Sequence, residues 1–140
     1  MPNISFSMTG NTPFQRLLGH NPSIMEAWNN LATTLEGDGS LHSSVKEQVR
    51  RTLAQNNDCD YCKAKGKPEY QLFDKKTAIA IGFTEVFLKQ GGKIEDAIFN
   101  VLKETFNERE ISELCAFICF TMASQYFGSI LSLEADNKVE

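Results

Sequence analysis

The chain has 140 residues and a mass of 15.7 kDa, the size of one ordinary globular domain. Hydrophobic residues make up 41% and charged residues 23% of it, which excludes a disordered, collagen-like or disulfide-scaffold chain. The formal net charge of -4 lacks the basic excess of nucleic-acid-binding proteins, so we expect no nucleic-acid partner. The densest apolar run, 114–122, is too short to cross a bilayer, and residues 1–14 do not resemble a secretory signal. We therefore expect a cytoplasmic protein that does not bind membranes.

Apolar residues recur with helical spacing through most of the chain, and no segment alternates with the two-residue period of a strand. The sequence predicts an all-α fold, a small bundle of about six to seven helices. We expect a flexible N-terminal arm over 1–12, a single helical domain over 13–133 and a polar C-terminal tail over 134–140.

The first two predicted helices are separated by a short turn. The first spans 13–18 and ends at Gly19, and the second begins with Asn21 as its cap and Pro22 in its first turn. The apolar stripe of this second helix consists of Ile24, Trp28, Leu31 and Leu35. We expect the stripe to face the core and the helix to end at Gly37.

A third helix is predicted after Leu41, with Ser43 or Ser44 as its cap. Glu47 has the spacing that would close a capping box with Ser44. A short fourth helix is expected from a cap at Asp58, and it carries a C-x-x-C motif. A glycine and a proline soon after the motif predict that this helix ends early, which would leave its second cysteine exposed.

The second half of the chain predicts three longer helices. Asp74 can cap the fifth, the sixth spans 94–106, and Asn107 with Glu110 forms a cap signature for the longest, 108–133. This last helix is apolar on more than one face, which is unusual for a surface helix of a monomer. It should be central in the bundle or lie at a subunit interface, and we expect a homo-oligomer.

The strongest candidate for chemistry is the motif formed by Cys59 and Cys62. Cysteines three residues apart on a helix lie on one side of it, with Cα atoms about 5 to 6 Å apart, which permits a disulfide. Free amides of the first helical turn favour a thiolate there, and Lys63 and Lys65 add weakly to this effect. We expect Cys62 to attack an oxidant and become a sulfenic acid, and Cys59 to condense with it to a disulfide.

Other interpretations of the cysteines remain open. The C-x-x-C pair can be inert, or can supply half of a zinc site. Cys115 and Cys119 lie within an apolar helix and are predicted to be small core residues rather than zinc ligands, so we expect no metal and no cofactor. His20 and His42 are expected on the surface, away from the thiols.

Glu47 lies twelve residues before Cys59, and its helix could fold back over the thiols. A bare carboxylate there would raise the pKa of a thiol, whereas a partly buried carboxyl group could carry protons for it. The alternative is that Glu47 only completes the capping box with Ser44.

These residues resemble a known family. Glu47, Cys59 and Cys62, with Tyr61 between the cysteines and an all-helical remainder, are similar to the alkylhydroperoxidase D-like branch of the carboxymuconolactone decarboxylase family over about 13–131. The resemblance implies a small all-helical fold, a trimer or hexamer, and reduction of a hydroperoxide substrate at the expense of a thiol reductant or a dithiol protein. It also implies that Cys62 is the attacking sulfur, Cys59 its partner and Glu47 the acid that starts a proton relay.

The chain departs from the family pattern where a histidine is expected. Members with the full pattern carry one four residues beyond the second cysteine, where this chain has Gly66, and the best-described relay has another at the position of Tyr61. Because histidine exchanges protons near neutral pH, its absence predicts slower thiol activation, or a route through water, Tyr61 or Glu47.

The sequence therefore predicts a thiol-dependent peroxidase with an altered proton relay. The alternative is a dithiol-disulfide exchange partner or redox sensor with little peroxidase activity of its own. A lactone decarboxylase ranks below both, because the chain offers no histidine cluster for that reaction.

Overall fold

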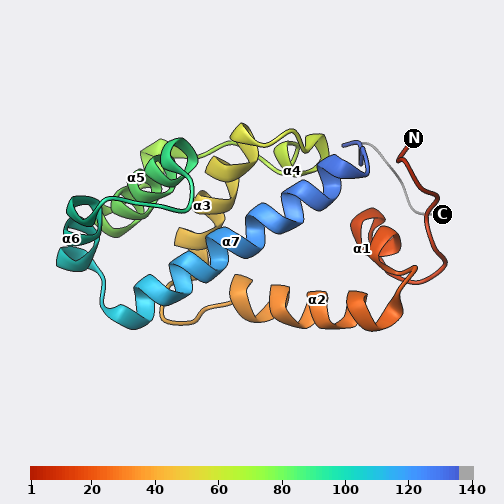
Figure 1. Ribbon diagram of the computed structural model, residues 1–140, viewed down its shortest axis with the longest axis horizontal. Helices are drawn as coiled ribbons and strands as arrows, with labels where there is room; N and C mark the ends of the chain where they lie inside the picture. Colours follow the sequence, from red (N-terminus) through yellow and green to blue (C-terminus); the bar gives the residue numbers. More distant parts are fainter. Residues whose placement is uncertain (136–140) are drawn as a thin grey trace.

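The computed structural model describes residues 1–135, and these form seven α-helices, one short 3-10 helix and no strand (Figure 1). The prediction of an all-α fold is confirmed. The elements are α1 (Pro13–Leu18), α2 (Pro22–Glu36), α3 (Ser43–Asn56), α4 (Asp60–Lys63), η1 (Tyr70–Leu72), α5 (Lys75–Gln90), α6 (Asp96–Thr105) and α7 (Glu108–Ile130). None of the helices within 1–135 is both long and apolar enough to span a membrane.

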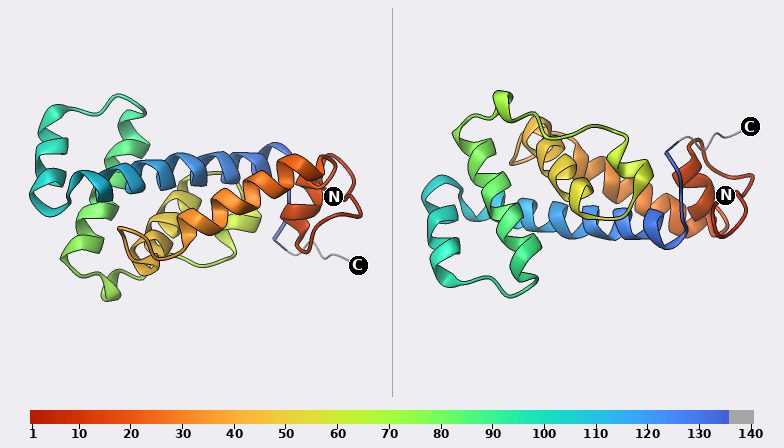
Figure 2. Two further views of the ribbon diagram at one scale, coloured as in Figure 1. Left: turned by 90° about the horizontal axis from the view of Figure 1, so that it is seen from below. Right: turned by 90° about the horizontal axis from the view of Figure 1, so that it is seen from above.

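The longest helix, α7, runs through the middle of the molecule and contacts α2, α3, α4 and α6 (Figure 1). The views of Figures 1 and 2 agree that α5 and α6 lie at one end, while α1 and the N-terminus lie at the other. Residues before α1 are held by two backbone hydrogen bonds. The Asn3 amide donates to the carbonyl of Leu131, directly after α7, and the Ser7 amide donates to the carbonyl of Arg16 in α1.

The main apolar core lies where α3, α5, α6 and the first half of α7 meet. Its most deeply buried members are Val49, Leu53, Ala80, Leu102, Leu114 and Ile118. The start of α7 is fixed by a complete capping box, in which Asn107 accepts from the Glu110 amide and the Glu110 side chain accepts from the Asn107 amide. This end of the molecule is therefore held by apolar packing and by a cap at Asn107, and the sequence predicted the cap.

Several predicted boundaries are shifted. The cap of α3 is His42, whose side chain makes no capping hydrogen bond, and the expected capping box of Ser44 with Glu47 does not form. Glu47 pairs instead with two arginines of its own helix. The helix α6 begins two residues later than predicted, and α7 ends at Ile130 rather than Leu133.

The expected core face of α2 is wrong in part. Ile24 and Leu31 are exposed, Leu35 is buried in the main core, and Trp28 is half-buried. The indole of Trp28 lies among the rings of Phe14, Phe120 and Phe127. The reason is that α2 covers one flank of α7 over a cavity instead of packing a full stripe into the core.

Candidate redox site

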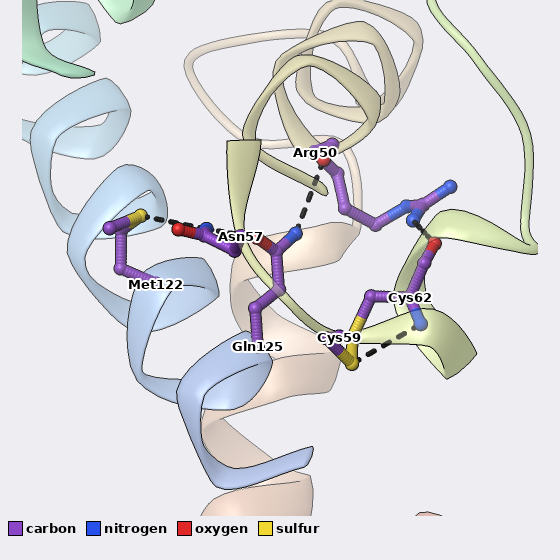
Figure 3. The surroundings of a disulfide bond; sticks show 6 residues. All are labelled: Arg50, Asn57, Cys59, Cys62, Met122 and Gln125. Carbon is purple, nitrogen blue, oxygen red and sulfur yellow. Dashed lines mark hydrogen bonds between the residues drawn. A yellow bond between two sulfur atoms is a disulfide. The ribbon is translucent and has the colours of Figure 1, made fainter. Parts of the chain in front are cut away.

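Cys59 and Cys62 form a disulfide, with Cα atoms 5.2 Å apart, within the range expected from their spacing (Figure 3). The cap of α4 is Cys59 rather than the predicted Asp58, and its Sγ accepts a hydrogen bond of 3.3 Å from the Cys62 amide. Since α4 has only four residues, its dipole is small, and the expected help of a helix start to the thiolate is limited to this local amide.

The two sulfur-bearing residues differ in access to solvent. Cys59 is 0% exposed and Cys62 8% exposed, so the expectation of an exposed Cys62 is wrong. Of the two, Cys62 lines a cavity, whereas Cys59 lies behind it against Ala54 and α7. A small molecule can therefore reach the sulfur of Cys62 first.

The cavity beside Cys62 has a volume of about 280 Å³ and lies between α1, α2, α4 and α7. Five aromatic side chains line it: Phe14, Trp28, Tyr61, Phe117 and Phe120. The rings of Trp28 and Phe120 are 5.3 Å apart and those of Phe14 and Trp28 6.4 Å. These walls suit a ligand with an apolar or aromatic body.

A second, charged cavity of about 250 Å³ adjoins the first. The two share the lining residues Glu36, Arg50, Lys65 and Phe117. The second also includes Lys46 and Glu47, so its wall carries three cationic and two anionic side chains although the whole chain is acidic. The combined space is apolar at one end and charged at the other.

Arg50 connects Glu47 with the cysteine motif (Figure 3 shows its contact with Cys62). Its guanidinium donates to both carboxylate oxygens of Glu47, at 2.6 and 3.0 Å, and to the Cys62 carbonyl at 3.3 Å. Arg51 adds a further hydrogen bond of 3.0 Å to Glu47. Burial alone would raise the pKa of Glu47, but the hydrogen bonds and charges of the two arginines outweigh it and hold this pKa below its ordinary value.

The helix α7 supports the site from behind. The Gln125 amide accepts from Asn57 and donates to the Arg50 carbonyl at 3.3 Å, which ties the turn before α4 to α7 (Figure 3). A Cβ atom at Gly128 would lie 2.8 Å from the Cys59 sulfur, so only glycine allows α7 this close to the disulfide. These contacts join residues far apart in the sequence, and sequence analysis missed them.

Tyr61 and Lys65 flank Cys62 at the cavity. The Lys65 ammonium lies over the Tyr61 ring, 4.7 Å from its centroid. Burial, and then the nearby charge of Arg50, lower the pKa of Lys65, against a smaller opposite effect of Glu36 and Glu47. Burial raises the pKa of Tyr61, with a hydrogen bond to Thr12 acting the other way.

The position that carries a histidine in the resembled family is unfavourable here for any residue other than glycine. Gly66 has a φ of +125°, a backbone conformation that other residues rarely adopt. A Cβ there would lie 3.1 Å from the Arg51 guanidinium carbon, which occupies the adjacent space. Gly66 follows the end of α4 as predicted, yet the early end of that helix does not leave Cys62 exposed.

The remaining cysteines and histidines lie away from both cavities. Cys115 is half-buried against the main core, where burial raises the pKa of its thiol, whereas Cys119 is exposed, contrary to the prediction of a core residue. His20 hydrogen-bonds to the Ser5 carbonyl and His42 lies near Asp38 on the surface. No cluster of three potential metal ligands occurs within 1–135.

No protein-family model and no curated protein matches the chain. Several solved structures are similar to the chain, and two of them illustrate the shared fold. An uncharacterized peroxidase-related protein from Silicibacter sp. TM1040 aligns with a TM-score of 0.76 at 18% identity, over 86% of this chain and 74% of that one. A cysteine-to-alanine variant of the debrominase Bmp8, in complex with 2,3,4-tribromopyrrole, aligns with a TM-score of 0.72 at 13% identity, over 94% and 78%. At these identities the likeness shows the fold alone, and it supports the alkylhydroperoxidase-like fold that the sequence resemblance implied.

Proposed function

We propose that the protein is a thiol-dependent peroxidase that reduces organic hydroperoxides through Cys62 and Cys59. The observation that carries this proposal is the bonded cysteine pair whose outer member, Cys62, forms part of the wall of the aromatic cavity. The shared fold with a peroxidase-related protein supports a redox role. The aromatic walls favour a hydroperoxide with an apolar or aromatic body over hydrogen peroxide.

The reaction starts from the reduced pair. The Cys62 thiolate attacks the outer peroxide oxygen, the O–O bond breaks, and the product is an alcohol and a Cys62 sulfenic acid. The Cys59 thiol then attacks the Cys62 sulfur and releases water, which gives the disulfide. A small thiol reductant, which can enter the cavity beside Cys62, returns the two electrons. Glu47 contributes as a positioning residue, because it holds Arg50 against the Cys62 backbone.

The direct test measures hydroperoxide consumption with dithiothreitol as reductant. Cys62→Ser and Cys59→Ser should lower the rate to that of free dithiothreitol, while the matched control Cys119→Ser, which changes an exposed cysteine, should keep the full rate. Titration of free thiols should show two lost per equivalent of hydroperoxide, and mass spectrometry should map the bond to Cys59 and Cys62. Activity that survives in both site variants would remove the pair from the mechanism.

The expected homo-oligomer is part of the proposal. Tyr126 and Ile130 on α7, and Ile24 and Leu31 on α2, are large apolar side chains exposed in the single chain. A trimer or hexamer would cover such area. Analytical ultracentrifugation of the protein and of its Ile130→Glu variant tests this: a wild-type monomer would contradict it, and an assembly lost in the variant would support it.

A second candidate is reductive removal of a halogen from an aromatic ring. The aromatic cavity beside Cys62 favours it, and one structure with the same fold is a debrominase with a bound tribromopyrrole. In this reaction the Cys62 thiolate takes the bromine, the ring gains a proton, and Cys59 displaces bromide as the disulfide forms. The test incubates the protein with 2,3,4-tribromopyrrole and dithiothreitol and measures the bromide released. Bromide released by the wild type but not by Cys62→Ser would support this candidate, and no release by the wild type would contradict it.

Disulfide exchange with a partner protein receives less support. Such exchange needs a sulfur that a second protein can reach, and neither Cys59 nor Cys62 offers one in the bonded form. Sulfenic acid formation on Cys62 no faster than on a free thiol would nevertheless favour this role over the peroxidase.

A further inference from the structure

The peroxidase reaction needs a proton donor, because the oxygen that leaves the peroxide is an alkoxide, a poor leaving group until it is protonated. Neither histidine of the chain lines either cavity. The position that holds one in the resembled family is Gly66, where the backbone conformation is unfavourable for other residues and Arg51 lies close. The question is which side chain at the Cys62 cavity can take its place.

Two groups fit this task poorly. Glu47 lines only the charged cavity and is held by two arginines that lower its pKa, so at neutral pH it is a carboxylate without a proton to give. Tyr61 lines the aromatic cavity, but burial raises the pKa of its hydroxyl, which makes it a weaker acid than an ordinary phenol.

Lys65 has the required placement. It lines both cavities and follows Cys62 by three residues, and its backbone amide donates to the Cys62 carbonyl at 3.4 Å. Its ammonium lies over the ring of Tyr61, the residue next to Cys62. Among residues 1–135 the ammonium forms no salt bridge, so its protons are not committed to a carboxylate.

We propose that Lys65 is the acid of the reaction and protonates the oxygen that leaves when Cys62 attacks a hydroperoxide. This inference rests on the proposed peroxidase function. The Cys62 thiolate supplies an electron pair to the outer oxygen, the O–O bond breaks, and the inner oxygen takes a proton from the Lys65 ammonium to give the alcohol. The resulting amine regains a proton from the Cys59 thiol as Cys59 attacks the sulfenic acid. That proton then leaves with the hydroxide as water, and the next Cys62 thiol to ionise restores the ammonium.

The charged surroundings suit a lysine in this role. The titratable groups that share its two cavities are Glu36 from α2, Lys46, Glu47 and Arg50 from α3, and Tyr61 and Cys62 from α4. The lining residues from α1 and α7 carry no charge. Burial and Arg50 lower the pKa of Lys65, which makes its ammonium a better acid than that of an exposed lysine.

The test compares two reactions of the reduced protein. Reaction of Cys62 with cumene hydroperoxide needs a thiolate and a proton donor, whereas alkylation of Cys62 by iodoacetamide needs only the thiolate. We expect Lys65→Gln to slow the first reaction about a hundredfold and the second by a few-fold at most. Lys65→Arg keeps the positive charge but cannot release a proton, so it should also be slow with the hydroperoxide. The matched control is Lys67→Gln, two residues further along and outside both cavities.

The pH dependence gives a second readout. The wild-type hydroperoxide rate should rise as Cys62 ionises and fall again at high pH as Lys65 loses its proton, and Lys65→Gln should lack the fall. Three results would overturn the assignment of Lys65 but leave the proposed peroxidase function intact. They are an equal slowing of both reactions in Lys65→Gln, a Lys65→Gln variant as fast as the wild type, and a Lys65→Arg variant that reacts fast with the hydroperoxide. A wild-type protein that reacts no faster than a free thiol would overturn both.

Discussion

The two halves of α7 have different neighbours and different tasks. The first half, near Leu114 and Ile118, packs into the apolar core with α3, α5 and α6, and its Glu113 pairs with the buried ammonium of Lys46. The second half lines the aromatic cavity and contacts the disulfide through Gly128. Each half contains or faces a cysteine pair, yet only the pair faced by the second half is bonded and reaches a cavity. The position of a cysteine pair in the fold, and not only its presence in the sequence, thus determines whether it can form a disulfide beside a cavity.

The largest expected stability effect lies in the first half. Glu113 accepts from Lys46 at 3.2 Å and from the amides of Ser40 and Leu41, and Lys46 is only 1% exposed. Glu113→Ala would leave the ammonium without its counter-charge, at a cost of about 3 to 5 kcal/mol in the free energy of unfolding. Urea denaturation measures this loss. Lys46 also lines the charged cavity, so the rate per folded molecule with cumene hydroperoxide tests the separation: an unchanged rate shows that the halves act independently, and a changed rate that the unpaired ammonium influences the site.

The same carboxylate predicts an acid dependence. Burial would raise the pKa of Glu113, but hydrogen bonds from Leu41, Lys46 and Ser40 hold it below the ordinary value of 4.5. Because the folded pKa is below the unfolded one, the contribution is present above the unfolded pKa and is lost as pH falls through the folded pKa. Stability of the wild type should decline more steeply than that of Glu113→Gln in this range. Parallel declines would contradict the assignment.

The second half should be most sensitive at Gly128. In Gly128→Ala the new methyl group would press on the Cys59 sulfur, so we expect a loss of about 1 to 3 kcal/mol in the oxidised protein and a smaller one after reduction, when the sulfur can turn away. Thermal unfolding with and without dithiothreitol measures both. The control is Gly82→Ala in α5, where a methyl group meets nothing within 4 Å and should stabilise by about 0.5 to 1 kcal/mol.

The smallest effect is expected at the start of α7. Asn107→Ala removes half of the capping box and should cost about 1 kcal/mol of unfolding free energy. Chemical denaturation measures it, with Asn107→Ser as the variant that retains a cap. A change in the hydroperoxide rate of Asn107→Ala would show that the two halves of α7 are coupled after all.

The parts of the fold that were predictable from sequence are those set by local chemistry. Prolines, glycines and the caps at Asp74 and Asn107 act within a few residues, and they placed most helices within one or two positions. The face of α2 could not be predicted, because the spacing of Ile24 and Leu31 does not show whether the core or the outside of the molecule lies opposite them. The one-residue shift of the α4 cap arose because both Asp58 and Cys59 can accept the capping bond.

In the candidate site, too, the local features could be predicted from the sequence and the long-range contacts could not. The motif of Cys59 and Cys62 is visible from spacing, and the pairing of Glu47 with Arg50 could have been found from their separation of one helical turn. The contacts of Gln125 and Gly128 depend on how α7 crosses the turn before α4, which no local pattern encodes.

The left-handed backbone at Gly66 restricts the mutational paths open to this protein. A histidine introduced there in one step would meet both an unfavourable dihedral angle and the guanidinium of Arg51, which also holds Glu47 and Glu69. Accommodating the imidazole would be easier after a change at Arg51 or in the turn, so the effect of one substitution depends on the other.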